Sequence, residues 1–212
     1  MIEVKNLSKS FRSEVAVDDV TITFSSGAIH GLVGPNGSGK TVLMKLICGL
    51  LAPTNGTVTV NNKVIGKDVD FPPSLGIMIE TPGFIPYLSG YRNLKDLADI
   101  RKKIGKADIE AAMEKVGLDA HSRKRVGAYS LGMRQRLGIA QAIMEDPALL
   151  VLDEPMNGLD EQSVKLVRVL LLNLRDAGKT ILLASHHAED IQELCDTVCS
   201  MDCGRLKIER GQ

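Results

Sequence analysis

One short stretch of this sequence has the residue types and spacing of a phosphate-binding loop. GPNGSGKT, at 34–41, fits the pattern G-x-x-x-x-G-K-[ST], with an apolar run before it and helical spacing after it. Gly37 and Gly39 allow the backbone to curl so that its N–H groups face phosphate oxygens. Lys40 adds a positive charge, and the Thr41 hydroxyl suits Mg²⁺. The alternative is a glycine-rich turn without a ligand, but the context favours a nucleoside triphosphate site.

A second set of reactive residues follows the apolar run LLVLDEP. Asp153 and Glu154 stand at the expected C-terminal end of a buried strand, the edge where doubly wound sheets bind ligands. Asp153 suits a partner of Mg²⁺, and Glu154 is then free to orient or deprotonate a water molecule. The alternative is a pair of acids in the first turn of a helix. Asp160, which ends NGLD, can cap the next helix, act in the site, or do both.

The histidines differ in their expected roles. His186 directly follows the apolar run TILLA, so we expect it at the same sheet edge as Lys40 and Glu154, where an imidazole could contact a γ-phosphate or hold the water. We expect His187 to face solvent, and His30 and His121 to be structural or exposed.

A second anion site is predicted where YSLGMRQRL opens a helix. Ser130 is in the N-cap position and Gly132 follows, so free backbone N–H groups point outward there. This stretch lies about ninety residues after the first loop. The sequence thus contains two phosphate sites, and the second needs its own explanation.

The elements that must position these residues follow from hydrophobic periodicity and turn residues. We expect strands at 2–7, 20–24, 29–33, 75–80, 148–155 and 179–185, and hairpins at 56–65 and 197–209. We expect helices at 40–51, 88–104, 106–118, 161–178 and 188–195, and one after Ser130. Strands that alternate with helices predict an α/β fold with a mostly parallel sheet. The stretch 82–146 is mostly helical and reads as an insertion into that fold.

Composition excludes several classes of function. Lys plus Arg and Asp plus Glu both number 26, so no overall charge favours nucleic acid or an anionic membrane. No apolar run is long enough to span a bilayer, and the N-terminus has no signal-peptide core, so we expect a soluble, cytosolic protein without direct membrane insertion. Cys195, Cys199 and Cys203 are evenly spaced, which raises the alternative of a metal site. Their places at a helix end, in a strand and in a turn favour ordinary reduced thiols, as for Cys48.

Taken in order, the phosphate loop, YSLGMRQRL, LLVLDEP, NGLD and the histidine after TILLA resemble the nucleotide-binding subunit of an ABC transporter over essentially the whole chain. The resemblance implies a P-loop NTPase core with an N-terminal antiparallel β part, in one domain spanning 1–212. Its core would be 1–81 and 147–212, and 82–146 its helical signature subdomain. The alternative of a P-loop kinase or GTPase is excluded, because those families have no counterpart of the helix that YSLGMRQRL opens or of His186.

The resemblance implies ATP and Mg²⁺ as cofactors. Glu154 is the implied catalytic carboxylate, with His186 as switch histidine and Lys40 on phosphate; Thr41, Asp153 and Glu80 are the implied metal partners. Phe11 falls where family members stack an aromatic ring on adenine, although a core aromatic is the alternative. The residues implied to contact nucleotide are Phe11, Gly34, Pro35, Asn36, Gly37, Ser38, Gly39, Lys40, Thr41, Val42, Glu80, Ser130, Gly132 and Asp160.

The resemblance also explains the second anion site. In the family two such domains pack head to tail, so Ser130 and Gly132 of one copy complete the phosphate site of the other. It implies a partner ATPase domain, expected to be a second copy, and separate transmembrane permease subunits. The protein would then lie on the cytoplasmic face of a bacterial cell membrane.

The sequence departs from the commonest family pattern in two places. The signature is Y-S-L-G-M instead of L-S-G-G-Q, so Leu131 and Met133 are unusual, and Glu80 stands where a glutamine is usual. The stretch that contains Glu80, together with YSLGMRQRL, resembles the bacitracin-resistance and lantibiotic-immunity group, which implies export of an antimicrobial peptide or drug. The segment 80–93 would form the permease-docking surface. The alternative function is a soluble ABC-type ATPase that acts as an assembly or mechanical factor.

Overall fold

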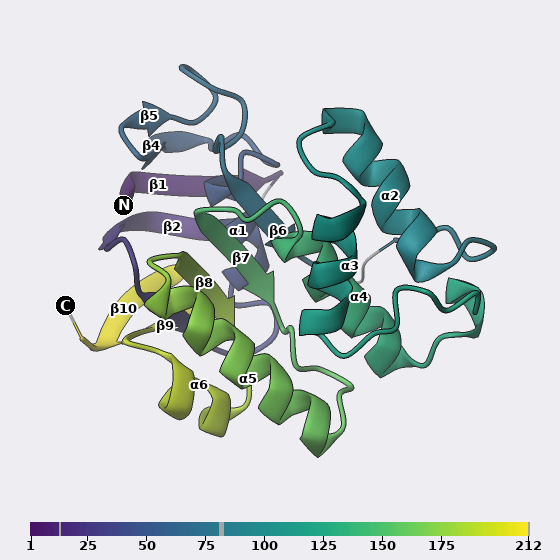
Figure 1. Ribbon diagram of the computed structural model, residues 1–212. Coiled ribbons are helices and arrows are strands. Elements are labelled where there is room, and N and C mark those ends of the chain that lie inside the picture. Colours follow the sequence, from purple (N-terminus) through teal and green to yellow (C-terminus); the bar gives the residue numbers. More distant parts are fainter. Residues whose placement is uncertain (13, 81–82, 212) are drawn as a thin grey trace.

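The larger of two β-sheets holds the strands that lead into the predicted site. A computed structural model describes residues 1–12, 14–80 and 83–211. In it, six strands pair in the order β10-β9-β3-β8-β7-β6 (Figure 1). All neighbouring strands are parallel except the hairpin of β9 and β10. The bounds are β3 Ile29–Val33, β6 Leu75–Met78, β7 Leu149–Asp153, β8 Thr180–Ala184, β9 Thr197–Asp202 and β10 Arg205–Arg210.

A second, antiparallel sheet has the order β2-β1-β4-β5. Its strands are β1 Ile2–Phe11, β2 Glu14–Phe24, β4 Asn55–Val60 and β5 Lys63–Val64. Asn61 and Asn62 have φ angles of 47° and 63° and form the two-residue turn of the hairpin predicted at 56–65. β1 and β2 are longer than predicted because their pairing continues to Phe11 and Glu14 through register shifts, which break the alternation visible in sequence.

Both faces of the parallel sheet are covered. Helix α1, Lys40–Ile47, buries Leu43, Met44, Leu46 and Ile47 in a core shared with both sheets. The other face packs against α5, Glu161–Asp176, and α6, Ala188–Leu194. Because alternate residues of β7 and β8 enter different cores, both strands are apolar except for Asp153, which ends β7, and Thr180, which begins β8.

The helices between β6 and β7 lie together beside β6, at the edge of the larger sheet (Figure 1). They comprise α2 Gly90–Arg101, α3 Lys106–Lys115, the short 3₁₀ turn η1 Val126–Ala128 and α4 Leu131–Ile143. Ser89 caps α2 and Ser130 caps α4, each by accepting a backbone N–H three residues later. None of the described helices combines the length and apolar character needed to cross a bilayer.

The sheet register brings the predicted reactive residues to one edge. Ala184, the last residue of β8, is level with both Leu32 of β3 and Asp153 of β7. The phosphate loop follows β3, Glu154 follows β7 and His186 follows β8 shortly after. Parallel strands thus deliver these residues to the same place, as the sequence predicts.

Candidate active site

An open hollow of about 550 Å³ lies at this edge of the sheet. Ten of the predicted site residues line it: Phe11, Asn36, Gly37, Gly39, Lys40, Thr41, Val42, Glu80, Asp153 and Glu154. It is also lined by Leu131 and Gln135 of α4 and by Asn157. The hollow therefore combines an N-terminal loop, a strand end and a helix from three separate parts of the chain.

Two glycines of the phosphate loop lie where a side chain would collide with neighbouring backbone. Gly34 and Gly39 have φ angles of 146° and 107°, and a Cβ would lie 2.1 Å from the Met201 carbonyl oxygen and 2.2 Å from that of Ala16, respectively. Gly39 leads directly into α1, whose first N–H groups have no intrahelical acceptor. The loop thus presents backbone donors at a helix N-terminus, the standard arrangement for an anion.

Lys40 is buried and contacts its own loop. Its Nζ donates to the carbonyl oxygens of Gly34 at 2.7 Å and Pro35 at 2.9 Å. The ammonium group is therefore held where it can exchange these carbonyls for phosphate oxygens with little movement of the chain. Ser38 is also buried, and its hydroxyl has no hydrogen-bond partner within the described residues.

Thr41 and Asp153 supply oxygen ligands next to the loop. The Thr41 hydroxyl donates to Asp153 Oδ2 at 2.7 Å. A hydroxyl and a carboxylate fit Mg²⁺, which usually takes one or two protein oxygens and completes its shell with phosphates and water. The described residues contain no group of three or more His, Cys, Asp or Glu side chains that could hold a metal ion by themselves.

Glu154 has an unusual backbone conformation. Its φ is 52°, in the left-handed region that non-glycine residues rarely adopt. Its side chain is one quarter exposed, and Oε2 lies 2.7 Å from Nδ1 of His186. The predicted carboxylate and histidine are thus adjacent, and both are accessible from solvent.

Gln135 is a residue of this site that the sequence analysis missed. Its Nε2 donates to the Glu154 carbonyl oxygen at 2.7 Å, and the side chain is 9% exposed. A signal exists, because Gln135 interrupts an otherwise apolar face of α4 that continues with Ile139 and Ala142. A buried amide on such a face needs a partner, and here the partner is the backbone of Glu154.

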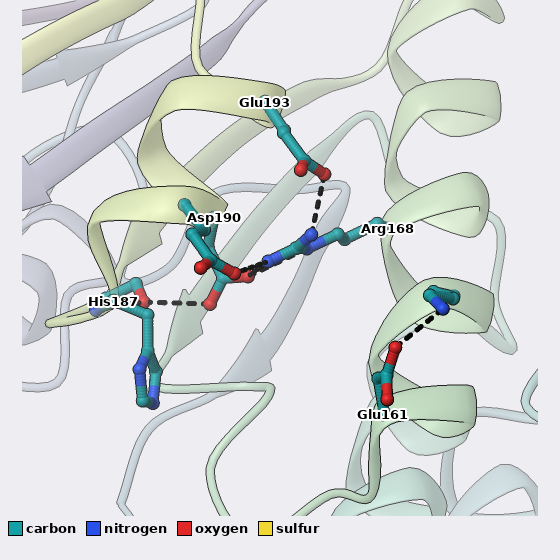
Figure 2. A network of polar contacts seen from close by, with 8 residues as sticks. Glu161, Arg168, His187, Asp190 and Glu193 are labelled. Carbon is teal, nitrogen blue, oxygen red and sulfur yellow. Dashed lines mark hydrogen bonds and ion pairs between the residues drawn. The ribbon is translucent and has the colours of Figure 1, made fainter.

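A polar network links the loop that follows β8 and carries His186 to helices α5 and α6 (Figure 2). The Ser185 hydroxyl accepts the His187 backbone N–H at 3.1 Å and donates to Asp190 Oδ2 at 3.2 Å. Asp190 in turn accepts from both Nε and Nη2 of Arg168, at 2.8 and 2.6 Å. His187 is exposed as predicted, and His186 borders a second hollow between α5 and α6.

The predicted second anion site has the expected local geometry. Ser130 Oγ accepts the Met133 N–H at 3.1 Å, so Ser130 is the N-cap of α4. Ser130 and Gly132 are not among the described residues that line the hollow, although Leu131 between them is. Leu131 also packs on Gly158, where a Cβ would meet its Cδ2 at 2.5 Å. The helix start therefore borders the hollow without turning its serine into it.

Asp160 acts as a helix cap. Its Oδ1 accepts the Ser163 N–H at 2.8 Å at the start of α5, and this hydrogen bond lowers the pKa of the Asp160 carboxyl below its ordinary value. The capping role is therefore present. A second role toward nucleotide stays a prediction.

Two further predictions can be judged at the rim of the site. Phe11 is 44% exposed and lines the hollow, with Lys9 Nζ 5.1 Å from its ring centre, so the alternative of a core aromatic is wrong.

Glu80 also lines the hollow, and its Oε1 lies 2.6 Å from Nζ of Lys45 on α1. The charge that Glu80 adds is thus balanced by a lysine one turn beyond the phosphate loop.

The remaining histidines and the cysteines lie where the sequence analysis placed them. His30 is buried and His121 is exposed. Cys195 is the C-cap of α6, Cys199 is on β9 and Cys203 is in the turn that follows. Burial raises the pKa of Cys195 to about 12 and that of Cys199 to about 11, so neither thiol ionises readily.

Comparison with known proteins agrees with this geometry. A family model described as ABC transporter matches residues 17–157. The chain is 44% identical to the uncharacterized ABC transporter ATP-binding protein YybJ of Bacillus subtilis, over 98% of this chain and 95% of the relative. It is 42% identical to the bacitracin transport ATP-binding protein BcrA of Enterococcus faecalis, over 97% and 68%, and 32% identical to the lantibiotic transport ATP-binding protein SrtF of Streptococcus pyogenes, over 99% and 90%.

Solved structures show the same fold. The dimeric bacterial ABC transporter cassette MJ0796 superimposes with a TM-score of 0.90 at 22% identity, covering 100% of this chain and 99% of that one. The chain therefore has the cassette fold, with a parallel sheet, an antiparallel N-terminal sheet and added helices. Together with the matched family model and the relatives, this shows that the chain belongs to the ABC transporter family, as an ATP-binding and ATP-hydrolysing subunit.

Proposed function

We propose that this subunit binds MgATP in the hollow beside the phosphate loop and uses its hydrolysis to drive export of an antimicrobial peptide or drug. The observation that carries the proposal is the meeting of three groups at one sheet edge. These are the Lys40 ammonium, the Thr41–Asp153 pair at 2.7 Å and the Glu154 carboxylate. Each has the chemistry that phosphoryl transfer to water requires.

In this proposal the phosphate loop and Lys40 hold the β- and γ-phosphates, and Thr41 and Asp153 are the protein ligands of Mg²⁺. The metal, when bound, neutralises the charge that develops on the phosphates. Glu154 orients the attacking water or accepts its proton. His186, which contacts Glu154 at 2.7 Å, holds the carboxylate or the γ-phosphate as the site fills.

The other predicted nucleotide contacts belong to the same proposal. Phe11 stacks on the adenine, since its ring is exposed at the rim of the hollow. Glu80 accepts hydrogen bonds from water bound to Mg²⁺, and Lys45 balances its charge. Gly34, Pro35, Asn36, Ser38 and Val42 shape the loop or contact the phosphates through their backbone.

The working unit in this proposal is a head-to-tail dimer of two copies. Ser130 and Gly132 then bind the nucleotide held by the partner, and Asp160 lies at the interface. The geometry at Ser130 supports this, because a capped helix start remains an anion site although Leu131 replaces a glycine. Because Ser130 and Gly132 do not line the hollow of their own chain, the phosphate bound at this helix start would belong to a nucleotide held by another chain.

We also propose that 82–146 acts as a subdomain that transmits movement to separate permease subunits, and that the protein works on the cytoplasmic face of a bacterial membrane. The proposed docking surface is the segment 80–93, of which residues 81 and 82, and with them the proposed subdomain boundary, lie outside the described residues. Ile85 and Tyr87 support it, since their side chains are 40% and 69% exposed. The names of BcrA and SrtF support a peptide cargo.

Replacing the proposed catalytic carboxylate tests the proposal. Glu154→Gln keeps the size of the side chain but removes its basicity, so we expect steady-state ATPase activity to fall by about 10²- to 10⁴-fold. ATP should still bind, and the variant should form an ATP-dependent dimer in size-exclusion chromatography. Glu114→Gln, at an exposed position on α3, is the matched control and should keep full activity. Hydrolysis by Glu154→Gln at the unmodified rate would contradict the role of Glu154.

A further inference from the structure

The peptide that carries the catalytic carboxylate is held in a costly conformation by its neighbours. A non-glycine residue with φ near 52° is strained and persists only where the surroundings enforce it. The Glu154 N–H donates to the Ala184 carbonyl at 3.0 Å. Its carbonyl oxygen accepts the Asn157 N–H at 3.1 Å and the Gln135 side-chain amide at 2.7 Å. Of these contacts, the shortest comes from a side chain.

That side chain belongs to an element on the far side of the hollow. Gln135 is on α4, the helix that Ser130 caps, and it contacts a residue nineteen positions further along the chain. It is almost completely buried, so the bond is shielded from competing water. A rigid helix of this length moves as one body. A shift of its N-terminus would therefore also move Gln135 and change its hydrogen bond to the Glu154 carbonyl oxygen.

We propose that Gln135 is a positioning residue for Glu154 and ties this carboxylate to the helix that begins at Ser130. The inference rests on the proposed function, in which Ser130 binds the partner's nucleotide while Glu154 serves the nucleotide of its own chain. ATP bound across the dimer then fixes the position of α4. Through the hydrogen bond from Gln135, the position of the Glu154 carboxylate depends on that of α4. Hydrolysis in one site thereby depends on occupancy of the other.

Gln135→Met tests the positioning role, because methionine has a similar length and lacks the donor. Without the amide, the 154 peptide can relax from its left-handed conformation and displace the carboxylate, and displacements near 1 Å can cost about 10²-fold in rate. We expect kcat to fall by about 10- to 100-fold, while KM and the binding of a fluorescent ATP analogue stay within about twofold. Gln141→Met on the same helix, at a half-buried position, is the matched control.

Gln135→Glu separates a loss of the donor from a loss of packing. An ionised carboxylate would face the Glu154 carbonyl oxygen and repel it, whereas the protonated acid can donate to it. Position 135 is buried and faces a carbonyl oxygen, and both factors raise the pKa of a carboxyl placed there. We therefore expect the activity of Gln135→Glu, relative to the unmodified protein, to rise as the pH is lowered from 8 to 6. Unchanged thermal melting of both variants would exclude misfolding. Full kcat in a folded Gln135→Met would overturn the inference, and so would the same pH profile for Gln135→Glu as for the unmodified protein.

A double-mutant cycle with Ser130→Ala tests the link between the two sites. Independent roles would make the losses in kcat multiply, whereas a shared path makes the combined loss smaller than the product. A multiplicative result overturns the link. Glu154→Gln in the same assay keeps this outcome separate from failure of the proposed function. If Glu154→Gln retains its activity, the proposed function fails; if only Gln135→Met does, the positioning role fails alone.

Discussion

His30, near the start of β3, is a titratable residue that the core holds in one protonation state. Its side chain is 2% exposed, and Nε2 donates to the Ser25 carbonyl at 2.8 Å. Burial lowers the pKa of His30, because a charged ring would lose its hydration. The Ser25 carbonyl and the Asp196 carboxylate act in the opposite direction, and the N-terminal amine acts with burial. Burial has the largest effect, so the ring stays neutral.

This lowered pKa predicts a loss of stability in mild acid. Below about pH 6.5 the unfolded chain takes up a proton on His30 that the folded chain does not, so the free energy of unfolding falls as the pH drops toward the lowered pKa. The slope from this residue is at most about 1.4 kcal/mol per pH unit. Urea unfolding at pH 7.5 and 5.5 should show a smaller acid loss for His30→Gln than for the unmodified protein. His121→Gln, at an exposed position, should not reduce the loss, and equal acid losses in all three proteins would contradict the prediction.

Single residues of the site differ in how far the sequence predicts them. Lys40, Thr41 and Asp153 were predictable, because a contiguous motif or an apolar strand fixes their surroundings within a few positions. Gln135 was not, since its role depends on a tertiary contact with a residue on another element. The positive φ of Glu154 was not predictable either, because two of the three hydrogen bonds made by its peptide groups involve Ala184 and Gln135 on other elements.

At the scale of elements, α5 and α6 are joined through a buried ion pair behind the loop that carries His186 (Figure 2). The Asp190 side chain is only 2% exposed and that of Arg168 15%, and the guanidinium also contacts Glu193 at 2.6 Å. Because Asp190 also accepts from Ser185, the pair fixes the end of β8 as well as the two helices. The ion pair therefore supports the loop as well as the packing of α6.

Breaking this pair should destabilise the protein strongly. Arg168→Met leaves the Asp190 carboxylate buried without its cation, and removal of one partner of a buried pair typically costs about 3–5 kcal/mol. Urea denaturation measures the change, and a further Asp190→Asn replacement should restore part of the loss. Lys165→Met on the same helix removes an exposed pair with Glu161 and should cost less than about 0.5 kcal/mol. Equal losses in the free energy of unfolding for Arg168→Met and Lys165→Met would show that the buried pair stabilises the protein no more than the exposed one.

The elements themselves were predicted unevenly, for physical reasons. Strand β3 was predicted at its observed bounds, and β7 and β8 within one or two residues at each end, because burial on both faces gives unbroken apolar runs ended by polar or glycine residues. β1 and β2 were predicted too short, since the register shifts after Val4 and Leu7 reverse which side chains face the core. Helix ends were set well wherever a serine, aspartate or glycine marks them, as at Ser89, Asp160 and Gly178.

At the scale of the whole molecule, the two predicted phosphate sites belong to different parts of one surface. The hollow is lined by the phosphate loop, Asp153 and Glu154, whereas Ser130 and Gly132 lie outside its described lining. In the proposed function, a single chain with this arrangement would hold the nucleotide from one side only. A second copy, rotated by a two-fold axis, would close each hollow with the other chain's helix start, because an isologous interface repeats every contact twice.

Mixing two defective proteins tests this arrangement directly. Glu154→Gln lacks the carboxylate that we propose as catalytic, and Ser130→Ala lacks the helix-cap hydroxyl that we assign to the partner's nucleotide. In a mixed dimer one site carries both defects, and the other combines an intact hollow with an intact helix start. An equal mixture should therefore recover up to about a quarter of the unmodified ATPase activity, since half of the dimers are mixed and each has one working site. If each chain instead completed its own site, every site in the mixture would keep one defect, and the activity of the mixture would stay at the average of the two variants alone.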